Sequence, residues 1–309
     1  MGKDLISIIT VNYKNRKITE EFLHSIVKLD RNDLEVIVID VDPSFDNTQH
    51  YRKIFFNVIV IHIEENIGFS AANNLGIDIS TGSFLYFTNN DTELTITSID
   101  PLVTFLKNND VGFISPKIKY YDSKNIIQYA GYTKVNALTG RNTTIGEFCQ
   151  DEKKEFSKSY ETTYIHGAAM MCKKALIEEV GKMPTEYFLY YEELDWSSKS
   201  HEVGKKNWYV GAAEIYHKES MSVGKESSLK EYFIIRNRMI FMIKHQKPLK
   251  ATLFVLYCSC IVIPKRLIIL LLKRKPTKFI NALINGYFDA LKFFIFKKRH
   301  IPNRGLKFL

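Results

Sequence analysis

The stretch "FLYFTNNDTEL", residues 84–94, joins an apolar strand to a polar cluster. Phe84 to Phe87 is aromatic and apolar and has strong strand propensity. The following residues 89–92 read Asn-Asn-Asp-Thr, and such small polar side chains can coordinate a cation or cap a helix. One interpretation is a turn, because Asn, Asp and Thr end many strands. The other is a binding site, and the rest of the chain has to decide between them.

Strand-like and helix-like segments alternate up to this stretch. We expect strands at 5–13, 34–40, 57–63 and 84–90, and helices near 17–29, after Ser44 and near 69–79. This alternation predicts an α/β fold with a doubly wound, mostly parallel, Rossmann-like sheet. The strands are almost continuously apolar, as expected when helices cover both faces of the sheet.

Polar residues follow all four expected strands. They are Asn12-Tyr13, Asp40 to Asp46, Glu65-Asn66 and Asn89 to Asp91. Ligands of open α/β sheets bind beyond the carboxyl ends of the strands. Four polar ends in succession therefore favour a binding site over a set of unrelated turns.

The segment 111–217 is less regular. Residues 110–122 predict a strand, 129–142 a meander or hairpin, and 149–163 an exposed loop. Residues 164–181 predict a strand that runs into a short helix.

The bulk composition indicates a folded protein. The chain has 309 residues, of which 45% are hydrophobic and 25% charged, so it has room for one large or two ordinary domains. Its four cysteines form no CxxC pair and predict reduced thiols in the cytoplasm. The first apolar stretch contains Asn12 and Tyr13, which indicates a strand and not a signal peptide.

The positive charge is concentrated in the tail, residues 246–309. The net charge is +9, and from Pro248 onward thirteen Lys and Arg residues face one acid, Asp289. The tail is also rich in Leu, Ile and Phe and has no recognisable nucleic-acid motif. We therefore expect an anionic membrane surface as its partner and no nucleic acid.

The tail is predicted to be helical. Its apolar run 251–263 ends at Pro-Lys-Arg, residues 264–266, and a second basic triplet follows at 273–275. A spanning helix needs about 20 apolar residues, and central cations with a proline make spanning costly. Residues 279–300 alternate apolar and polar positions at helical spacing. We expect helices lying on the inner face of the cell membrane; the alternative is a helical pair that packs on the rest of the chain or joins a homodimer.

The chain has neither of the common nucleotide-binding loops. "TVNYKNRK" follows the first strand where a GxGxxG would stand, and there is no Walker A sequence. A nucleotide would have to be held by strand-end carboxylates and a divalent metal. The Asn-x-Asp at 89–91 can do this, since its carboxylate binds a cation that bridges a diphosphate.

Seven segments, in order, resemble the inverting family-two glycosyltransferases of the GT-A fold. They are "ISIITVNYKN", "VIVIDVDPSFDNT", "ENIGFSAANNLGI", "FLYFTNNDTEL", "HGAAMMCKKALIEEVGKM", "YFLYYEELDWSSKSHEVGKKNWYV" and "AEIYHKESMSVG". The resemblance covers residues 5 to about 245. It implies a GT-A catalytic domain over 1–245, with a nucleotide-sugar half at about 1–110 and an acceptor half at about 111–245, followed by a basic helical extension at 246–309.

The resemblance implies a Mn²⁺ or Mg²⁺ site. Asp91, with Asn89 beside it, would hold the cation against the diphosphate of a sugar nucleotide. His217 matches the family's metal-binding histidine. Negative charge develops on the leaving nucleoside diphosphate, and a divalent cation stabilises it.

The acids of "YYEELDW" are the candidates for catalysis. Acids at a helix N-terminus also favour the helix dipole and need no catalytic role. A general base has to take the proton of the attacking acceptor hydroxyl. The resemblance places this base at Glu193, where Asp is commoner in the family; Asp195 is the second candidate and Glu192 a supporting residue.

The donor would be held at the strand ends. In the family an acid after the second strand contacts the nucleotide base. Here "DVDPSFD" is one residue longer than the usual pattern, so both Asp40 and Asp42 fit, and Asp40 is favoured. The other expected donor contacts are Asn12, Tyr13, Asn66, Gly68, Asn73, Asn74, Asn89 and Asn90. For Gly68 the alternative is tight helix–sheet packing.

The leading hypothesis is a metal-dependent inverting glycosyltransferase. It would move a sugar, with dTDP-rhamnose the favoured donor, onto a glycan or lipid-linked acceptor of a bacterial surface polysaccharide such as a capsule or O-antigen. One alternative is a sugar-nucleotidyltransferase, which usually has a Gly-rich loop after its first strand. Another is a non-catalytic binding protein on the same scaffold.

Overall fold

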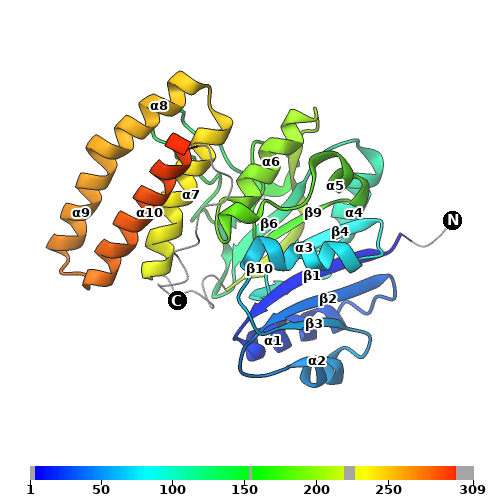
Figure 1. Cartoon of the computed structure of the whole chain (residues 1–309). Helices are drawn as coiled ribbons and strands as arrows, with labels where there is room; N and C mark the ends of the chain where they lie inside the picture. The colour runs from blue at the N-terminus through cyan, green and yellow to red at the C-terminus, as the bar shows by residue number, and fades with distance from the viewer. Residues whose placement is uncertain (1–3, 153–154, 219–226, 297–309) are drawn as a thin grey trace.

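The computed structural model describes residues 4–152, 155–218 and 227–296 (Figure 1). A ten-stranded sheet with the order β3-β2-β1-β4-β9-β6-β10-β5 forms its centre, with β7 paired to β6 and β8 to β10. Helices cover both faces, and a helical unit from the C-terminal part lies beside the sheet. The predicted α/β, doubly wound architecture is confirmed.

The first half of the chain forms the parallel part of the sheet. Its elements are β1 (Ile6–Tyr13), α1 (Arg16–Val27), β2 (Leu34–Val41), α2 (Thr48–Ile54), β3 (Ile59–Ile63), α3 (Phe69–Ile79) and β4 (Phe84–Thr88). All pairings among these strands are parallel. Ile8 and Ile9 point to opposite faces: Ile8 joins the core under α1 and α2, and Ile9 the core under α3. β1, β2 and β4 are therefore mostly apolar because both of their faces are buried, whereas the edge strand β3 is partly exposed.

The second half mixes parallel and antiparallel strands. Its elements are β5 (Thr92–Leu94), α4 (Asp100–Asn108), β6 (Ile114–Tyr120), β7 (Ser123–Tyr129), β8 (Tyr160–Thr162), β9 (Ala169–Lys173), α5 (Lys174–Val180), α6 (Glu192–Glu202) and β10 (Asn207–His217). β9 runs antiparallel between β4 and β6, and β10 is parallel to β6. α4 packs on the α1 face, and α5 and α6 pack on the α3 face.

Two details of this half differ from the prediction. The expected exposed loop 149–163 contains β8, which pairs with β10. Tyr160 packs its ring 4.9 Å from Tyr209, so a polar-looking segment gains an apolar contact that its local composition does not show. A hairpin is formed by β6 and β7. The predicted meander at 129–142 is also present as irregular antiparallel pairing, with a bridge between Tyr132 and Thr144 and a bond from the Asn136 amide to the Arg141 carbonyl at 2.8 Å. Residues 153–154 lie outside the described part of the chain.

The sheet register aligns the polar strand ends. Asn12 pairs with Asp40 between β1 and β2, and Asp40 pairs with His62 between β2 and β3. At the other end of the sheet, β5 and β10 run antiparallel with His217 opposite Thr92. This pairing places His217 beside Asp91.

The tail folds onto the preceding helix. α7 (Ser228–His245) leads into a continuous helix made of α8 (Pro248–Tyr257), a π-helical turn (Cys258–Val262) and α9 (Ile263–Leu272), and α10 (Thr277–Phe296) returns along α7 (Figure 1). An added Cβ at Gly286 would lie 2.6 Å from the Tyr232 carbonyl oxygen, so glycine permits this close approach. The π-helical turn precedes Pro264 and accommodates its missing N–H. Residues 297–300 of the predicted second helix lie outside the described residues.

The outer face of the tail helices is apolar and exposed. The helices Pro248–Leu272 and Thr277–Phe296 are long and apolar enough to cross a membrane, with mean hydropathies of 2.1 and 1.3. Only 22% and 28% of their most apolar windows are buried within the protein. The exposed residues include Leu249, Leu253, Leu256, Ile261, Ile268, Leu271, Leu272, Phe288, Ile295 and Phe296.

Candidate active site

Asp91 and His217 form a buried pair at the carboxyl edge of the sheet. His217 Nε2 lies 3.1 Å from Asp91 Oδ1, and His217 Nδ1 lies 2.9 Å from Gln128 Oε1. Gln128 is on β7 and His217 on β10, and Asp91 lies in the turn between β4 and β5, so two strands and a turn contribute to the group. The predicted association of Asp91 with His217 is present in the structure.

This pair has the geometry of two ligands of one cation. In the tautomer that carries its proton on Nδ1, His217 donates to Gln128 Oε1 and its Nε2 lone pair faces Asp91 Oδ1. Two lone-pair atoms 3.1 Å apart repel each other unless a proton or a cation lies between them. Adjacent ligands with metal bonds of about 2.1 Å are themselves roughly 3 Å apart. The residues present therefore fit a divalent cation such as Mn²⁺ or Mg²⁺.

The turn after β4 fixes the neighbours of Asp91. The Asn89 amide donates to the Ala168 carbonyl at 3.0 Å, and the Asn89 carbonyl accepts from the Thr92 hydroxyl at 2.8 Å. Asn90 is buried and donates to Asn12 Oδ1 at 3.2 Å and to Thr19 Oγ1 at 2.8 Å. Asn89 thus stands next to the cation-fitting pair, whereas Asn90 and Asn12 tie β1 to β4 inside the fold.

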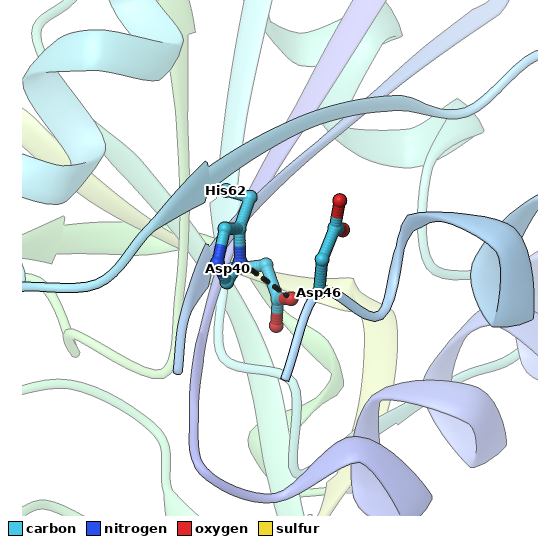
Figure 2. A group of neighbouring side chains, drawn as sticks. All are labelled: Asp40, Asp46 and His62. Carbon is cyan, nitrogen blue, oxygen red and sulfur yellow. Dashed lines mark ion pairs between the residues drawn. The ribbon is translucent and has the colours of Figure 1, made fainter. Parts of the chain in front are cut away.

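Asp40 lies in a second acidic group at the end of β2. Asp40, Asp46 and His62 offer ligand atoms within 4.8 Å of one another, and Figure 2 shows the Asp40–His62 ion pair of 3.5 Å. The group is a candidate metal site by composition. However, the fully buried Asp40 carboxylate already accepts from Asn12 at 2.7 Å and Tyr51 at 3.2 Å, and also from Asn47. A cation there would replace these bonds, so the Asp91–His217 pair fits a metal better.

Asp42 and Tyr13 are more accessible than Asp40. Asp42 is half-buried and accepts from the Ser44 amide at 2.9 Å, which closes a short turn past the end of β2. Tyr13 is also half-buried, and the Lys14 ammonium lies 5.3 Å from its ring. Of the two acids predicted for the nucleotide base, the structure leaves Asp42 open to a ligand.

Gly68 is explained by packing. Its φ is +86°, and an added Cβ would lie 2.5 Å from Phe188 Cδ2. Asn66 Oδ1 accepts from the Gly68 amide at 3.0 Å and holds this entry into α3. The alternative interpretation of Gly68, a tight contact, is therefore present in the structure.

The two asparagines of α3 are also engaged inside the fold. Asn74 bonds both backbone groups of Met183 at 2.9 Å, and Asn73 donates to the Phe69 carbonyl at 2.9 Å. Asn74 thereby links α3 to the loop that precedes α6. Asn74 therefore contributes to the site by positioning that loop.

Glu193, at the start of α6, has a carboxylate that is only partly satisfied by hydrogen bonds. Among the described residues, its Oε2 has no hydrogen-bond partner, and neither has Oε2 of Glu192. Burial raises the pKa of Glu193 to about 7. Burial, and then repulsion from Glu193, raises the pKa of Glu192 well above its usual value. A carboxyl group with a pKa near 7 is suited to general-base catalysis at neutral pH.

Asp195 has a different environment. It accepts from Tyr187 at 2.8 Å, Lys244 at 2.5 Å and His245 at 3.0 Å. Burial would raise the pKa of Asp195, but the His245 hydrogen bond and the Lys244 charge outweigh burial and hold this pKa well below its usual range. Asp195 therefore links α6 to α7 as a paired anion. Because these partners engage its carboxylate, Asp195 is less available than Glu193 to act as a base.

We predict that Asp195→Asn destabilises the protein by about 3 kcal/mol, because it breaks a buried ion pair. Urea unfolding at pH 7.5 measures the loss. The loss should shrink below about pH 4, since the depressed pKa of Asp195 means that its stabilisation is present at higher pH and disappears on protonation. The matched control is Asp78→Asn, whose pair with Lys182 is about half exposed and should cost well under 1 kcal/mol. Equal losses for the two variants would contradict the structural role of Asp195.

The segment 166–168 connects the cation-fitting pair to Glu193. The His166 ring lies 6.1 Å from the His217 ring, and the Ala168 carbonyl accepts from the Asn89 amide. Between them, an added Cβ at Gly167 would lie 3.6 Å from Glu193 Cδ. Burial and the neighbouring His217 lower the pKa of His166 to about 3, so His166 is neutral at pH 7. The Asp91–His217 pair and the Glu193 carboxylate therefore lie on either side of one short backbone segment.

Sequence reasoning missed several residues of this region. His166 and Gly167 lie in the segment "HGAAMM", and nothing in that segment by itself assigns a role to either residue. Gln128 has no local signal, since its contact with His217 spans 89 residues. Asn237 of α7 donates to the carbonyls of Tyr187, Leu189 and Tyr190 at 2.7–2.9 Å and so shapes the loop before Glu193.

Together, the cation-fitting pair at the sheet edge and the Glu193 carboxylate on α6 suit a group-transfer enzyme. Residues 7–181 match the family described as Glycosyl transferase family 2. The chain belongs to this family and is a glycosyltransferase.

Similar proteins support this class. The chain is 25% identical over 248 residues to the low-salt glycan biosynthesis hexosyltransferase Agl10 of Haloferax volcanii, covering 77% of this chain and 75% of that protein. It is 20% identical over 247 residues to an N-acetylglucosaminyl-diphospho-decaprenol L-rhamnosyltransferase of Mycobacterium tuberculosis, covering 72% and 79%. The crystal structure of GalNAc-T7 with UDP, GalNAc and Mn²⁺ superposes with a TM-score of 0.64 at 17% identity, over 83% of this chain and 51% of that one. The fold is thus of the GT-A type.

Proposed function

We propose that this protein is a metal-dependent, inverting glycosyltransferase that uses a nucleotide-diphosphate sugar. The observation that carries the proposal is the position of the Asp91–His217 pair and the Glu193 carboxylate on either side of residues 166–168. The names of the relatives, a hexosyltransferase and a rhamnosyltransferase, support a hexosyl donor. Family membership sets aside the two alternatives, a nucleotidyltransferase and a non-catalytic binding protein.

Each group has a distinct role in this mechanism. Asp91 and His217, with Asn89, would hold the cation, which when bound supplies positive charge to the leaving diphosphate. Glu193 takes the proton of the acceptor hydroxyl as that oxygen attacks the anomeric carbon. Because no enzyme nucleophile intervenes, one displacement inverts the anomeric centre.

The strand ends bind and orient the donor. We assign the nucleotide-base contact to Asp42, because Asp40 is fully buried and saturated by hydrogen bonds. Asp40 and Asn12 instead fix the relative positions of the strand ends. Gly68 and Asn74 contact the loop before α6, and Asn66 and Asn73 hold the first turn of α3. Tyr13 is accessible at the end of β1 and is assigned to the donor side.

The direct test is donor hydrolysis across a panel of nucleotide sugars with Mn²⁺, Mg²⁺ or EDTA. We expect one donor class to be hydrolysed with either metal and not with EDTA. Among the candidate donors we favour dTDP-rhamnose, because the Mycobacterium tuberculosis relative is a rhamnosyltransferase. Hydrolysis that continues undiminished in EDTA would contradict the metal assignment, and no hydrolysis of any donor would contradict the function.

We predict that the transfer rate rises with pH through about 7 and is constant above it. Glu193 acts in its deprotonated form, and burial raises its pKa to about 7, so the fraction of active base falls below that pH. The measurement is kcat against pH between 5.5 and 9 at saturating donor, acceptor and Mn²⁺. A flat profile from pH 6 to 8 would be inconsistent with Glu193 as the base.

We also propose that the enzyme works at the cytoplasmic face of the membrane, attached through the tail helices. Their exposed apolar residues and many cations suit an anionic bilayer. Deleting the tail is a poor test, because it would uncover the face of α7 on which α10 packs. Surface substitutions leave this packing in place.

We predict that Leu253→Ser with Leu256→Ser lowers binding to phosphatidylglycerol vesicles at least about 10-fold. These side chains are 49% and 55% exposed, and each loses about 1.5–3 kcal/mol of apolar burial in the bilayer. Sedimentation at low and high salt measures the bound fraction. Ile96→Ser, at an 84% exposed site outside the tail, is the control and should bind as the wild type does. Unaltered sedimentation of the double variant would exclude this face as the anchor.

A further inference from the structure

The tail helices enclose a basic cavity that the proposed chemistry does not use. The cavity has a volume of about 500 Å³ and lies between α7, α9 and α10, with Arg141 at its border. This volume is within the range of small-molecule binding sites. Its cationic lining residues are Arg141, Lys230, Arg238, Lys265, Arg266, Lys273 and Lys275.

The cavity has a large excess of positive charge. Among the described residues that line it, Glu231 is the one acid, and it is paired with Arg266 at 2.7 and 2.5 Å. This pair neutralises one of the lining cations. Arg238, Lys230, Lys265 and Lys273 also line the cavity, and several cations together favour a ligand with more than one negative charge.

Arg238 is the strongest sign of a ligand. Its side chain is 7% exposed, and within the described part of the chain its Nε has no hydrogen-bond partner and no carboxylate lies in ion-pair contact with it. A buried cation without a counter-ion is costly, by several kcal/mol. Guanidinium groups bind phosphate oxygens in pairs of parallel hydrogen bonds. An incoming phosphate group would supply the partner that Arg238 Nε lacks among the described residues.

The rest of the lining is apolar. Ile261, Ile269, Leu270 and Leu283 line the cavity together with the cations. An inorganic anion would leave these side chains unused, whereas a lipid with a charged head would contact both kinds of surface. The same helices carry the exposed apolar face that we assign to the membrane, so a lipid chain can reach the cavity from the bilayer.

The cavity also lies close to the proposed base. Tyr191, the residue before α6, packs against the apolar cluster that includes the cavity-lining residues Leu270 and Leu283. This cluster therefore extends from the cavity to the start of the helix that carries Glu193. A sugar attached to a phosphate held by Arg238 would extend towards this base.

We propose that this cavity binds the diphosphate and the adjoining apolar chain of a lipid that carries the acceptor sugar. The proposal rests on the proposed function, since it names the acceptor class of the same reaction. Arg238 and the surrounding lysines bind the diphosphate, the apolar lining binds the first part of the lipid chain, and the sugar reaches Glu193.

The test is calorimetric titration of the full chain with farnesyl diphosphate as the probe. We expect farnesyl diphosphate to bind more tightly than either farnesol or inorganic diphosphate. Farnesol cannot engage the cations of the cavity, and inorganic diphosphate cannot engage its apolar lining. Arg238→Met, which keeps an unbranched chain and removes the charge, should weaken binding at least about 10-fold. Lys250→Met removes a charge from an exposed position of α8 outside the cavity lining and should bind within about 2-fold of the wild type.

Three results would overturn the proposal. These are equal affinity of Arg238→Met and wild type, equal affinity for inorganic diphosphate and farnesyl diphosphate, and complete competition by phosphatidylglycerol vesicles, which would make the cavity a bilayer headgroup site. If Arg238→Met does not fold, Lys265→Met with Lys273→Met at the exposed border replaces it, with a loss of at least about 5-fold expected and an unchanged affinity overturning the site.

Donor hydrolysis without acceptor, measured on the same wild-type preparation, separates this proposal from the proposed function. Hydrolysis without farnesyl diphosphate binding would overturn the lipid cavity and leave the transferase intact. Binding without hydrolysis of any donor would instead count against the proposed function.

Discussion

Asp91→Asn is expected to lower metal-dependent transfer by about 10³-fold at saturating Mn²⁺. The substitution keeps the size of the side chain and removes the charge that binds the cation, and charge stabilisation at a leaving group is worth several kcal/mol. A steady-state assay over a Mn²⁺ titration measures kcat, and circular dichroism checks the fold. His217→Gln, which removes the second ligand, should shift the Mn²⁺ midpoint upward.

Asp46→Asn is the matched control for this prediction. Asp46 belongs to the other acidic group, with Asp40 and His62, and is exposed. Its substitution should change kcat by less than about 3-fold. If Asp46→Asn were inactive and Asp91→Asn active, the cation would lie at the end of β2 and the metal assignment would be wrong.

Glu193→Gln should lower kcat by about 10²-fold or more and leave donor affinity nearly unchanged. Loss of a general base typically costs 10²–10⁴-fold in rate, and the donor does not depend on this carboxylate. The measurement is kcat with nucleotide-sugar affinity determined separately by calorimetry. Glu192→Gln is the comparison, since it removes the neighbouring buried carboxyl group and should have the smaller effect.

Asp195→Asn distinguishes the two acids proposed for the base. We expect it to retain most of its kcat at a temperature at which it is folded, because its role is to pair with Lys244 and His245. An active Glu193→Gln together with a folded but inactive Asp195→Asn would move the base by two residues.

The parallel half of the sheet was predictable because its signals are local. Each strand there is a continuous apolar run, and helix α3 begins at Phe69 as the sequence indicates. The second half depends on contacts between distant segments. β5 has three residues, and its pairing with β10 joins Asp91 to a histidine 126 residues away. Only the ordered resemblance of motifs suggested that contact.

The roles of the acids could not be ranked from the sequence alone. Glu193 and Asp195 stand two residues apart at the start of one helix, and both suit its dipole. Their tertiary contacts distinguish them. Asp195 pairs with Lys244 and His245 of α7, whereas Glu193 packs against Gly167. In the same way, Asp40 and Asp42 differ by burial, which a one-residue insertion in the motif does not reveal.

The tail shows the same limit. Its composition predicted helices and a membrane surface, but Pro264 read as an interruption. The π-helical turn before it keeps the helix continuous. The cations of the basic cavity come from α7, from α9 and the turn after it, and from Arg141, so no single segment of sequence displays the cavity.

The central claim, a single displacement at the anomeric carbon with Glu193 as the base, is tested most directly by the configuration of the first product. Proton NMR is recorded during hydrolysis of the donor that the panel identifies. It gives the anomeric configuration of the released sugar before the two anomers of that sugar equilibrate. We predict an anomeric configuration opposite to that of the donor. A product with the donor's own configuration would contradict the account.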